Sequence, residues 1–124
     1  MAQNKTILFV EDEEELLLSI SQLLREAGFN VLGVPHAEAA LQQLIDHRPD
    51  LILADIKLPG IDGFDFFSQV KANNDWRDIP VVFLTAFNDV QAMMYAKEVG
   101  IREYITKPFE FEYLITRIRA IVLP

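Results

Sequence analysis

The sequence contains no cysteine, which excludes a disulfide-braced fold, thiol catalysis and cysteine-ligated zinc. Positive charge is scarce as well, because 11 Lys and Arg residues face 19 Asp and Glu residues and leave a formal net charge of −8. Such a surface repels phosphate backbones and anionic headgroups, so we expect no direct binding to nucleic acid or membranes. Long apolar runs are also missing near the start, where only the four residues Ile7–Val10 precede the acidic run Glu11–Glu15. That pattern is neither a signal peptide nor a membrane span, and we expect a cytoplasmic protein.

The residues that are present suit one compact domain over positions 1–124. Hydrophobic residues make up 51% of the chain and charged residues 24%, and there are nine Phe. This composition excludes disorder, and a domain of this size needs neither a metal nor a disulfide to fold.

Apolar runs alternate with helical patterns along the chain. Short apolar runs predict five strands, at residues 7–10, 29–34, 51–54, 81–84 and 103–106. Apolar residues at helical spacing predict five helices, over residues 13–27, 37–45, 64–70, 89–98 and 110–122. The apolar stripe of the second helix ends at Ile45, the third helix carries Phe64, Phe67 and Val70, and Asn88 or Asp89 can cap the fourth. Gly28 and Gly100 follow two of these helices as natural stops. The alternation with short connections predicts an α/β fold, a parallel sheet with helices on both faces.

Chemically active side chains follow four of the predicted strands. Glu11 and Asp12 follow the first, Asp55 the third, Thr85 the fourth and Lys107 the fifth. Parallel sheets place their sites at this edge, and gathered carboxylates repel one another unless a cation lies among them. Mg²⁺ suits oxygen ligands, and a hydroxyl and an ammonium beside it suit a phosphoryl group. Asp55 is the expected nucleophile because it lies centrally, and Asp12, supported by Glu11, is the expected metal ligand.

Four sequence blocks at these positions resemble those of response regulator receiver domains, in order and over essentially the whole chain. The blocks are Ile7–Asp12 (ILFVED), Leu51–Gly63 (LILADIKLPGIDG), Val81–Ala86 (VVFLTA) and Tyr104–Phe109 (YITKPF). Any one block is a weak signal, whereas all four at the family's spacing are specific. The resemblance implies a flavodoxin-like, doubly wound five-stranded sheet in the order 2-1-3-4-5.

The resemblance also assigns roles to the site. Asp55 would accept a phosphoryl group from the phosphohistidine of a sensor histidine kinase or a phosphotransfer protein, and the chain would not be a turnover enzyme. Mg²⁺ would be bound by Asp12, Asp55 and the main-chain carbonyl of Lys57, with Glu11 holding a water of the metal. The expected phosphate-binding and switch residues are Thr85, Ala86 through its main-chain N–H, Tyr104 and Lys107. The Lys107–Pro108 peptide bond would be cis.

The expected output is a change of surface. Thr85 and the Tyr104 ring would move together on phosphorylation, and the fourth helix, fifth strand and fifth helix would pass the signal to an effector domain or downstream protein. Gly100–Glu103 reads Gly-Ile-Arg-Glu, where transcription-factor members have Gly-Ala-Asp-Asp, so whether the chain forms a homodimer stays open. Lys57 and Phe87 flank the expected path of the hydrolytic water, and a bulky Phe87 favours a longer-lived phosphoaspartate.

Other functions remain to be weighed. A pseudo-receiver, an interaction module not regulated by phosphorylation, usually loses an equivalent of Asp55, Thr85 or Lys107, and this chain keeps all three. Haloacid-dehalogenase-type phosphatases need a second Asp where this chain has Lys57. A flavin carrier would need Ser, Thr and Gly after the first strand, where the loop is acidic.

Several residues have structural explanations. Glu13–Glu15 suit a solvated first helical turn, and Asp62 suits a helix cap. His36 and His47 have no partner at metal-ligand spacing. Met93–Tyr95 cannot all be buried by one helix, so these residues, with Phe111 and Tyr113, form either an exposed apolar partner surface or ordinary core packing.

Overall fold

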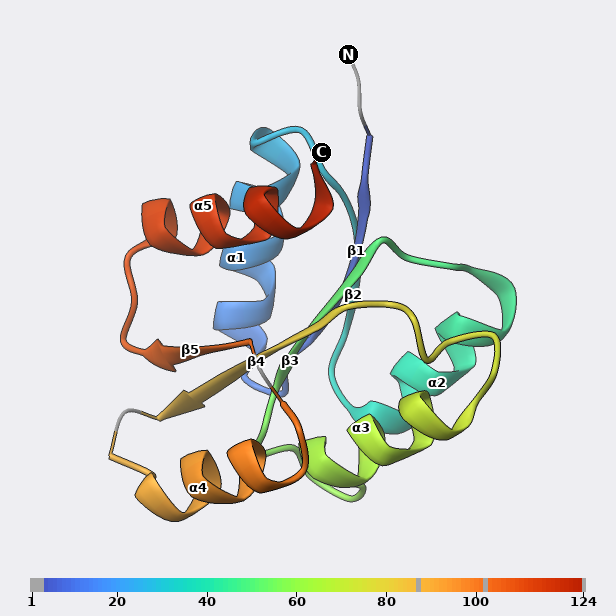
Figure 1. Ribbon diagram of the computed structural model, residues 1–124. Helices are drawn as coiled ribbons and strands as arrows, with labels where there is room; N and C mark the ends of the chain where they lie inside the picture. The colour runs from blue at the N-terminus through green and yellow to red at the C-terminus, as the bar shows by residue number, and fades with distance from the viewer. Residues whose placement is uncertain (1–3, 87, 102, 124) are drawn as a thin grey trace.

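Five parallel strands form one sheet in the order β2-β1-β3-β4-β5, as predicted (Figure 1). The computed structural model describes residues 4–86, 88–101 and 103–123. The strands are β1 (Thr6–Val10), β2 (Asn30–Val34), β3 (Leu51–Asp55), β4 (Val81–Ala86) and β5 (Tyr104–Lys107). The helices between and after them are α1 (Glu14–Glu26), α2 (Ala37–Asp46), α3 (Gly63–Ala72), α4 (Val90–Glu98) and α5 (Phe111–Val122).

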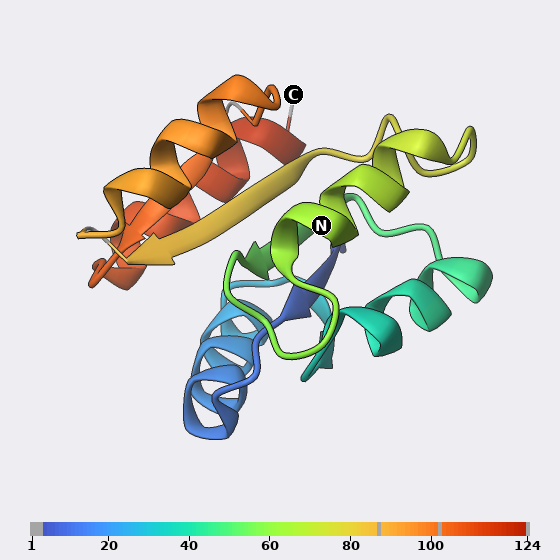
Figure 2. The same cartoon turned by 90° about the horizontal axis from the view of Figure 1, so that it is seen from below.

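The helices cover both faces of the sheet. α1 and α5 lie on one face, and α2, α3 and α4 lie on the other (Figures 1 and 2). Successive strand side chains therefore enter two different cores, which explains why the inner strands β1, β3 and β4 consist mostly of apolar residues. In β1, Ile7 and Phe9 join the core under α1 and α5, while Leu8 and Val10 join the core under the other three helices.

Local signals fix where the helices begin and end. Asp62 caps α3 by accepting the N–H of Asp65 at 2.9 Å, and Asp89 caps α4 by accepting the N–H of Ala92 at 3.1 Å. Gly28 and Gly100 follow α1 and α4 with φ of 104° and 91°, the left-handed conformation that glycine adopts without strain.

The buried side chains of α3 and α2 differ in two details from those that the sequence predicts. Phe66, rather than Phe64 or Phe67, is the fully buried phenylalanine of α3, because it shares a face with Val70 four residues later. Ile45, one residue before the end of α2, is 65% exposed and does not belong to the core. Phe64 and Phe67 pack at the edge of the core.

In the part of the chain that the structure describes, no helix is long and apolar enough to cross a membrane.

Candidate functional site

The register of the strands brings the predicted residues to one edge of the sheet. Val10 pairs with Ala54, so Glu11, the residue after β1, lies beside Asp55, the last residue of β3. Asp55 in turn pairs with Leu84, which places Thr85 just beyond it on β4. Ala86 pairs with Lys107 on β5, so all four neighbouring strands contribute to the same edge.

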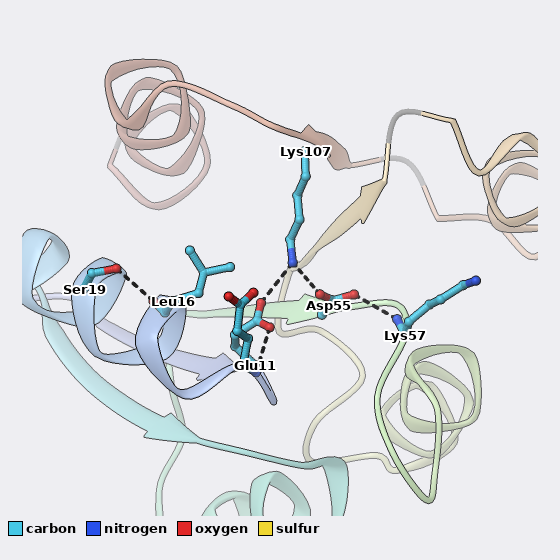
Figure 3. A network of polar contacts seen from close by, with 7 residues as sticks. Glu11, Leu16, Ser19, Asp55, Lys57 and Lys107 are labelled. Carbon is cyan, nitrogen blue, oxygen red and sulfur yellow. Dashed lines mark hydrogen bonds and ion pairs between the residues drawn. The ribbon is translucent and has the colours of Figure 1, made fainter.

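Lys107 is the centre of the polar contacts at this edge (Figure 3). Its ammonium Nζ lies 2.6 Å from Oδ2 of Asp55 and 3.2 Å from Oε1 of Glu11. The other oxygen of each carboxylate accepts a backbone N–H, from Lys57 to Asp55 at 2.9 Å and from Glu13 to Glu11 at 3.1 Å. Both carboxylates are therefore held in fixed positions, as a site that must present an oxygen to a substrate requires.

Burial and charge act in opposite directions on this network. Burial raises the pKa of Glu11, although the N–H of Glu13 and the nearby ammonium of Lys107 pull it down in part. Burial alone would lower the pKa of Lys107, but the hydrogen bond and charge of Asp55, together with Glu11, outweigh it and raise that pKa above its usual range. Lys107 is therefore an ammonium at neutral pH and is the counter-charge of the two carboxylates.

A third carboxylate completes an acidic cluster. One oxygen from each of Glu11, Asp12 and Asp55 lies within 4.8 Å of the other two. Asp12 is exposed, whereas the other two are buried, so the cluster is open to solvent on the side of Asp12. Hard oxygen donors with one solvent-facing side match what Mg²⁺ requires, because this ion binds a few carboxylates and retains several waters.

Asp55 also lines a pocket of about 390 Å³. The lining combines two carboxylates, a hydroxyl group and two ammonium groups, and consists of Asp55, Lys57, Thr85, Ala86, Asn88, Asp89 and Lys107. Thr85 is only 3% exposed, so its position at the end of β4 is fixed by packing. The pocket is large enough for a phosphoryl group and has the Lys107 ammonium in its wall beside Asp55.

Some predicted residues lie elsewhere. Tyr104 is half-buried on β5 and lines a separate hollow with Lys97, Gly100 and Ile101. Phe87 falls outside the described residues. The peptide bond between Lys107 and Pro108 is cis.

Asn88 and Asp89 are the pocket residues that the sequence patterns presented only as helix caps. The signal that could have found them is their place directly after β4, in the same loop that follows Thr85. His36 is a cap, since its Nδ1 accepts the N–H of Ala39 at 3.1 Å. Neither histidine belongs to a metal-binding group within the described ranges.

Comparison with known proteins decides the family. The family model described as "Response regulator receiver domain" matches residues 7–119. The chain belongs to this family. This receiver is 36% identical to the phosphate regulon transcriptional regulatory protein PhoB of Pseudomonas aeruginosa over 118 residues, 95% of the receiver and 52% of PhoB. It thus spans about half the length of the curated relatives it matches.

Solved structures of receivers superpose closely on this one. A putative response regulator from Chloroflexus aurantiacus has a TM-score of 0.90 at 33% identity, covering 98% of this chain and 100% of that one. The receiver domain of the sensor histidine kinase PA1611 of Pseudomonas aeruginosa has a TM-score of 0.88 at 28% identity, covering 97% and 98% of the two chains. That structure holds a magnesium ion coordinated in its active site cleft.

Proposed function

We propose that Asp55 of this receiver takes a phosphoryl group from the phosphohistidine of a sensor histidine kinase or phosphotransfer protein in a Mg²⁺-dependent reaction. The supporting observation is that Asp55 belongs both to the acidic cluster and to the lining of the 390 Å³ pocket, with the Lys107 ammonium 2.6 Å away. Asp55, Thr85 and Lys107 are all present, so nothing at these positions favours a pseudo-receiver. The receiver accepts and loses one phosphoryl group and is not a turnover enzyme.

The transfer needs an oxygen nucleophile and positive charge. An oxygen of Asp55 attacks phosphorus, the P–N bond to the imidazole breaks, and its electron pair returns to the ring nitrogen, which takes up a proton. Lys107 neutralises a phosphoryl oxygen and Thr85 donates a hydrogen bond to another. Asp12, Asp55 and the main-chain carbonyl of Lys57 would hold Mg²⁺, with Glu11 in support, and this ion would neutralise further phosphoryl charge.

Lys107 must change partners during the reaction. In the unphosphorylated receiver its ammonium is shared between Asp55 and Glu11. A phosphoryl group on Asp55 removes that carboxylate charge and supplies new oxygens in the adjacent pocket, so the ammonium turns toward them. Local charge then biases the receiver between two arrangements, with Thr85 and Tyr104 as the moving pair.

The output surface is the edge formed by α4, β5 and α5. The two helices flank the edge strand β5 from opposite faces of the sheet (Figures 1 and 2). Met94 is 64% exposed, Tyr95 48% and Tyr113 53%, so large apolar side chains on both helices face solvent. An effector domain or a downstream protein would bury these side chains, and an effector domain agrees with the greater length of the PhoB relatives.

Intact mass spectrometry after incubation with Mg²⁺ and acetyl phosphate tests the proposal. We expect the mass of one phosphoryl group to be gained by the wild type and not by Asp55→Asn or by wild type with a chelator. Beryllofluoride, a stable phosphoryl mimic, reveals an acceptor whose adduct hydrolyses too fast to be detected. No mass gain and no beryllofluoride binding, with the fold intact, would refute the assignment.

A further inference from the structure

An ion pair lies at the pocket of Asp55 and takes no part in the phosphotransfer proposed above. The Lys57 ammonium is 3.2 Å from Oδ2 of Asp89, and both residues line the pocket. The Lys57 side chain is 81% exposed and runs away from Asp55 (Figure 3). One of the two ammonium groups that line the pocket, that of Lys57, is therefore already paired with the carboxylate of Asp89.

The two members of this pair differ in mobility. Asp89 is fixed as the cap of α4, where its Oδ1 accepts the N–H of Ala92 at 3.1 Å. That hydrogen bond, together with Lys57, lowers the pKa of Asp89, so the group is a carboxylate at neutral pH. Lys57 has its backbone N–H on Asp55, while its ammonium stands at the end of a flexible four-carbon stem. Any change in the pair is consequently a movement of Lys57.

We propose that Asp89 is a positioning residue. Its carboxylate keeps the Lys57 ammonium away from the position of the phosphoryl group, and the ammonium leaves Asp89 for the phosphoryl oxygens when Asp55 is phosphorylated. The inference rests on the proposed function. A phosphoryl group brings about two negative charges into the pocket, against the single charge of Asp89. Both anions compete for one ammonium, so Asp89 weakens phosphoryl binding, and phosphoryl binding loosens the contact at the start of α4.

The expected size of the effect follows from the exposure of the pair. Exposed ion pairs change an equilibrium by about 1.4- to fivefold. Asp89→Asn removes the charge and keeps an oxygen for the N–H of Ala92, so beryllofluoride should bind more tightly by about this factor. The effect should shrink with added salt, because an exposed pair is screened.

A double-mutant cycle separates this role from simple repulsion. Wild type, Asp89→Asn, Lys57→Met and the double variant are titrated with beryllofluoride in the presence of Mg²⁺ by calorimetry, at low and high salt. The amide resonance of Ala92 in a ¹⁵N-labelled sample reports the start of α4 at each step. Asp62→Asn is the matched control, because Asp62 caps α3 through Asp65 in the same way and does not line the pocket.

We expect Asp89→Asn to tighten beryllofluoride binding when Lys57 is present and to have no effect when Lys57 is replaced by Met. The control Asp62→Asn should leave beryllofluoride binding unchanged. We also expect beryllofluoride to shift the Ala92 amide of the wild type more than that of Lys57→Met. Equal tightening in both backgrounds would mean that Asp89 repels the anion directly, and would overturn the proposal. So would unchanged binding in Asp89→Asn. If the wild type binds no beryllofluoride, the phosphoacceptor assignment fails and this inference with it, whereas binding with a flat cycle overturns this inference alone.

Discussion

Gly63→Ala should displace the backbone segment that carries Asp55. A Cβ at Gly63, the first residue of α3, would lie 2.7 Å from both Cα and the carbonyl oxygen of Ile56 and 2.9 Å from the carbonyl oxygen of Asp55. Ordinary carbon contacts begin at about 3.5 Å, so the segment must move by roughly 0.8 Å. No rotamer change can relieve the clash, because all three atoms belong to the main chain.

The cost of this displacement can be bounded. Overpacking of this kind costs about 1–3 kcal/mol, and the better helix propensity of alanine returns at most about 1 kcal/mol. The movement also distorts the hydrogen bond from the N–H of Gly63 to the carbonyl of Ile56, which measures 2.8 Å. We therefore expect the free energy of unfolding to fall by about 1–2 kcal/mol. We also expect weaker Mg²⁺ binding, because the shifted segment continues into the carbonyl of Lys57.

Urea unfolding in metal-free buffer and calorimetric titration with Mg²⁺ measure both effects. Gly33→Ala is the control, since a Cβ there would meet only the side-chain atoms Oγ of Ser21 at 3.2 Å and Cδ1 of Leu17 at 3.3 Å, which can move. This control should lose less stability and keep its Mg²⁺ affinity. Equal losses in the two variants would refute the reasoning that the rigid backbone contact matters.

Three further predictions concern buried polar groups. Ser21→Ala should raise the free energy of unfolding by about 1 kcal/mol in urea titrations, because Oγ of Ser21 is buried without a hydrogen-bond partner among the described residues; a loss of stability would contradict this. Because the pKa of Glu11 lies above its ordinary 4.5 in the folded state, its contribution to stability is fully present below pH 4.5 and is lost as the pH rises through the raised pKa. Metal-free wild type should lose stability over that window relative to Glu11→Gln, and parallel unfolding curves would disprove it. Lys107→Met leaves two buried carboxylates without their cation, so the free energy of unfolding without metal should fall by about 1–3 kcal/mol. The variant should also bind Mg²⁺ more tightly than the wild type, and weaker binding in calorimetry would contradict this prediction.

The fold was accessible from the sequence because the three inner strands, β1, β3 and β4, are buried on both faces along most of their length. A run such as Leu51–Ala54 is apolar throughout, and the segments between the runs have helical spacing with caps and glycine stops. The convergence of Glu11, Asp55 and Lys107 followed as well, because parallel strands align their carboxyl ends. The contacts of Lys107 with Glu11 and Asp55 in the structure agree with that expectation.

Other features depend on three-dimensional contacts that residue spacing does not encode. The burial of Phe66 rather than Phe64 depends on how α3 is rotated against the sheet. The contact between Lys57 and Asp89 joins the loops that follow β3 and β4, and these residues lie 32 positions apart in the sequence. Periodicity reports which face of an element is apolar, but it does not report the distance between two polar loop residues.

The order of the strands along the chain also bears on how the molecule assembles during synthesis. The subsheet β2-β1-β3 is built entirely from residues 6–55, and the carboxyl ends of β1 and β3 carry Glu11, Asp12 and Asp55. Lys107, their counter-charge, is translated some fifty residues after Asp55. A nascent chain that pairs these strands early therefore gathers three anions before its own cation exists. The three carboxylates then repel one another without the Lys107 ammonium, so the charge that equips the finished protein for signalling also disfavours its half-made form.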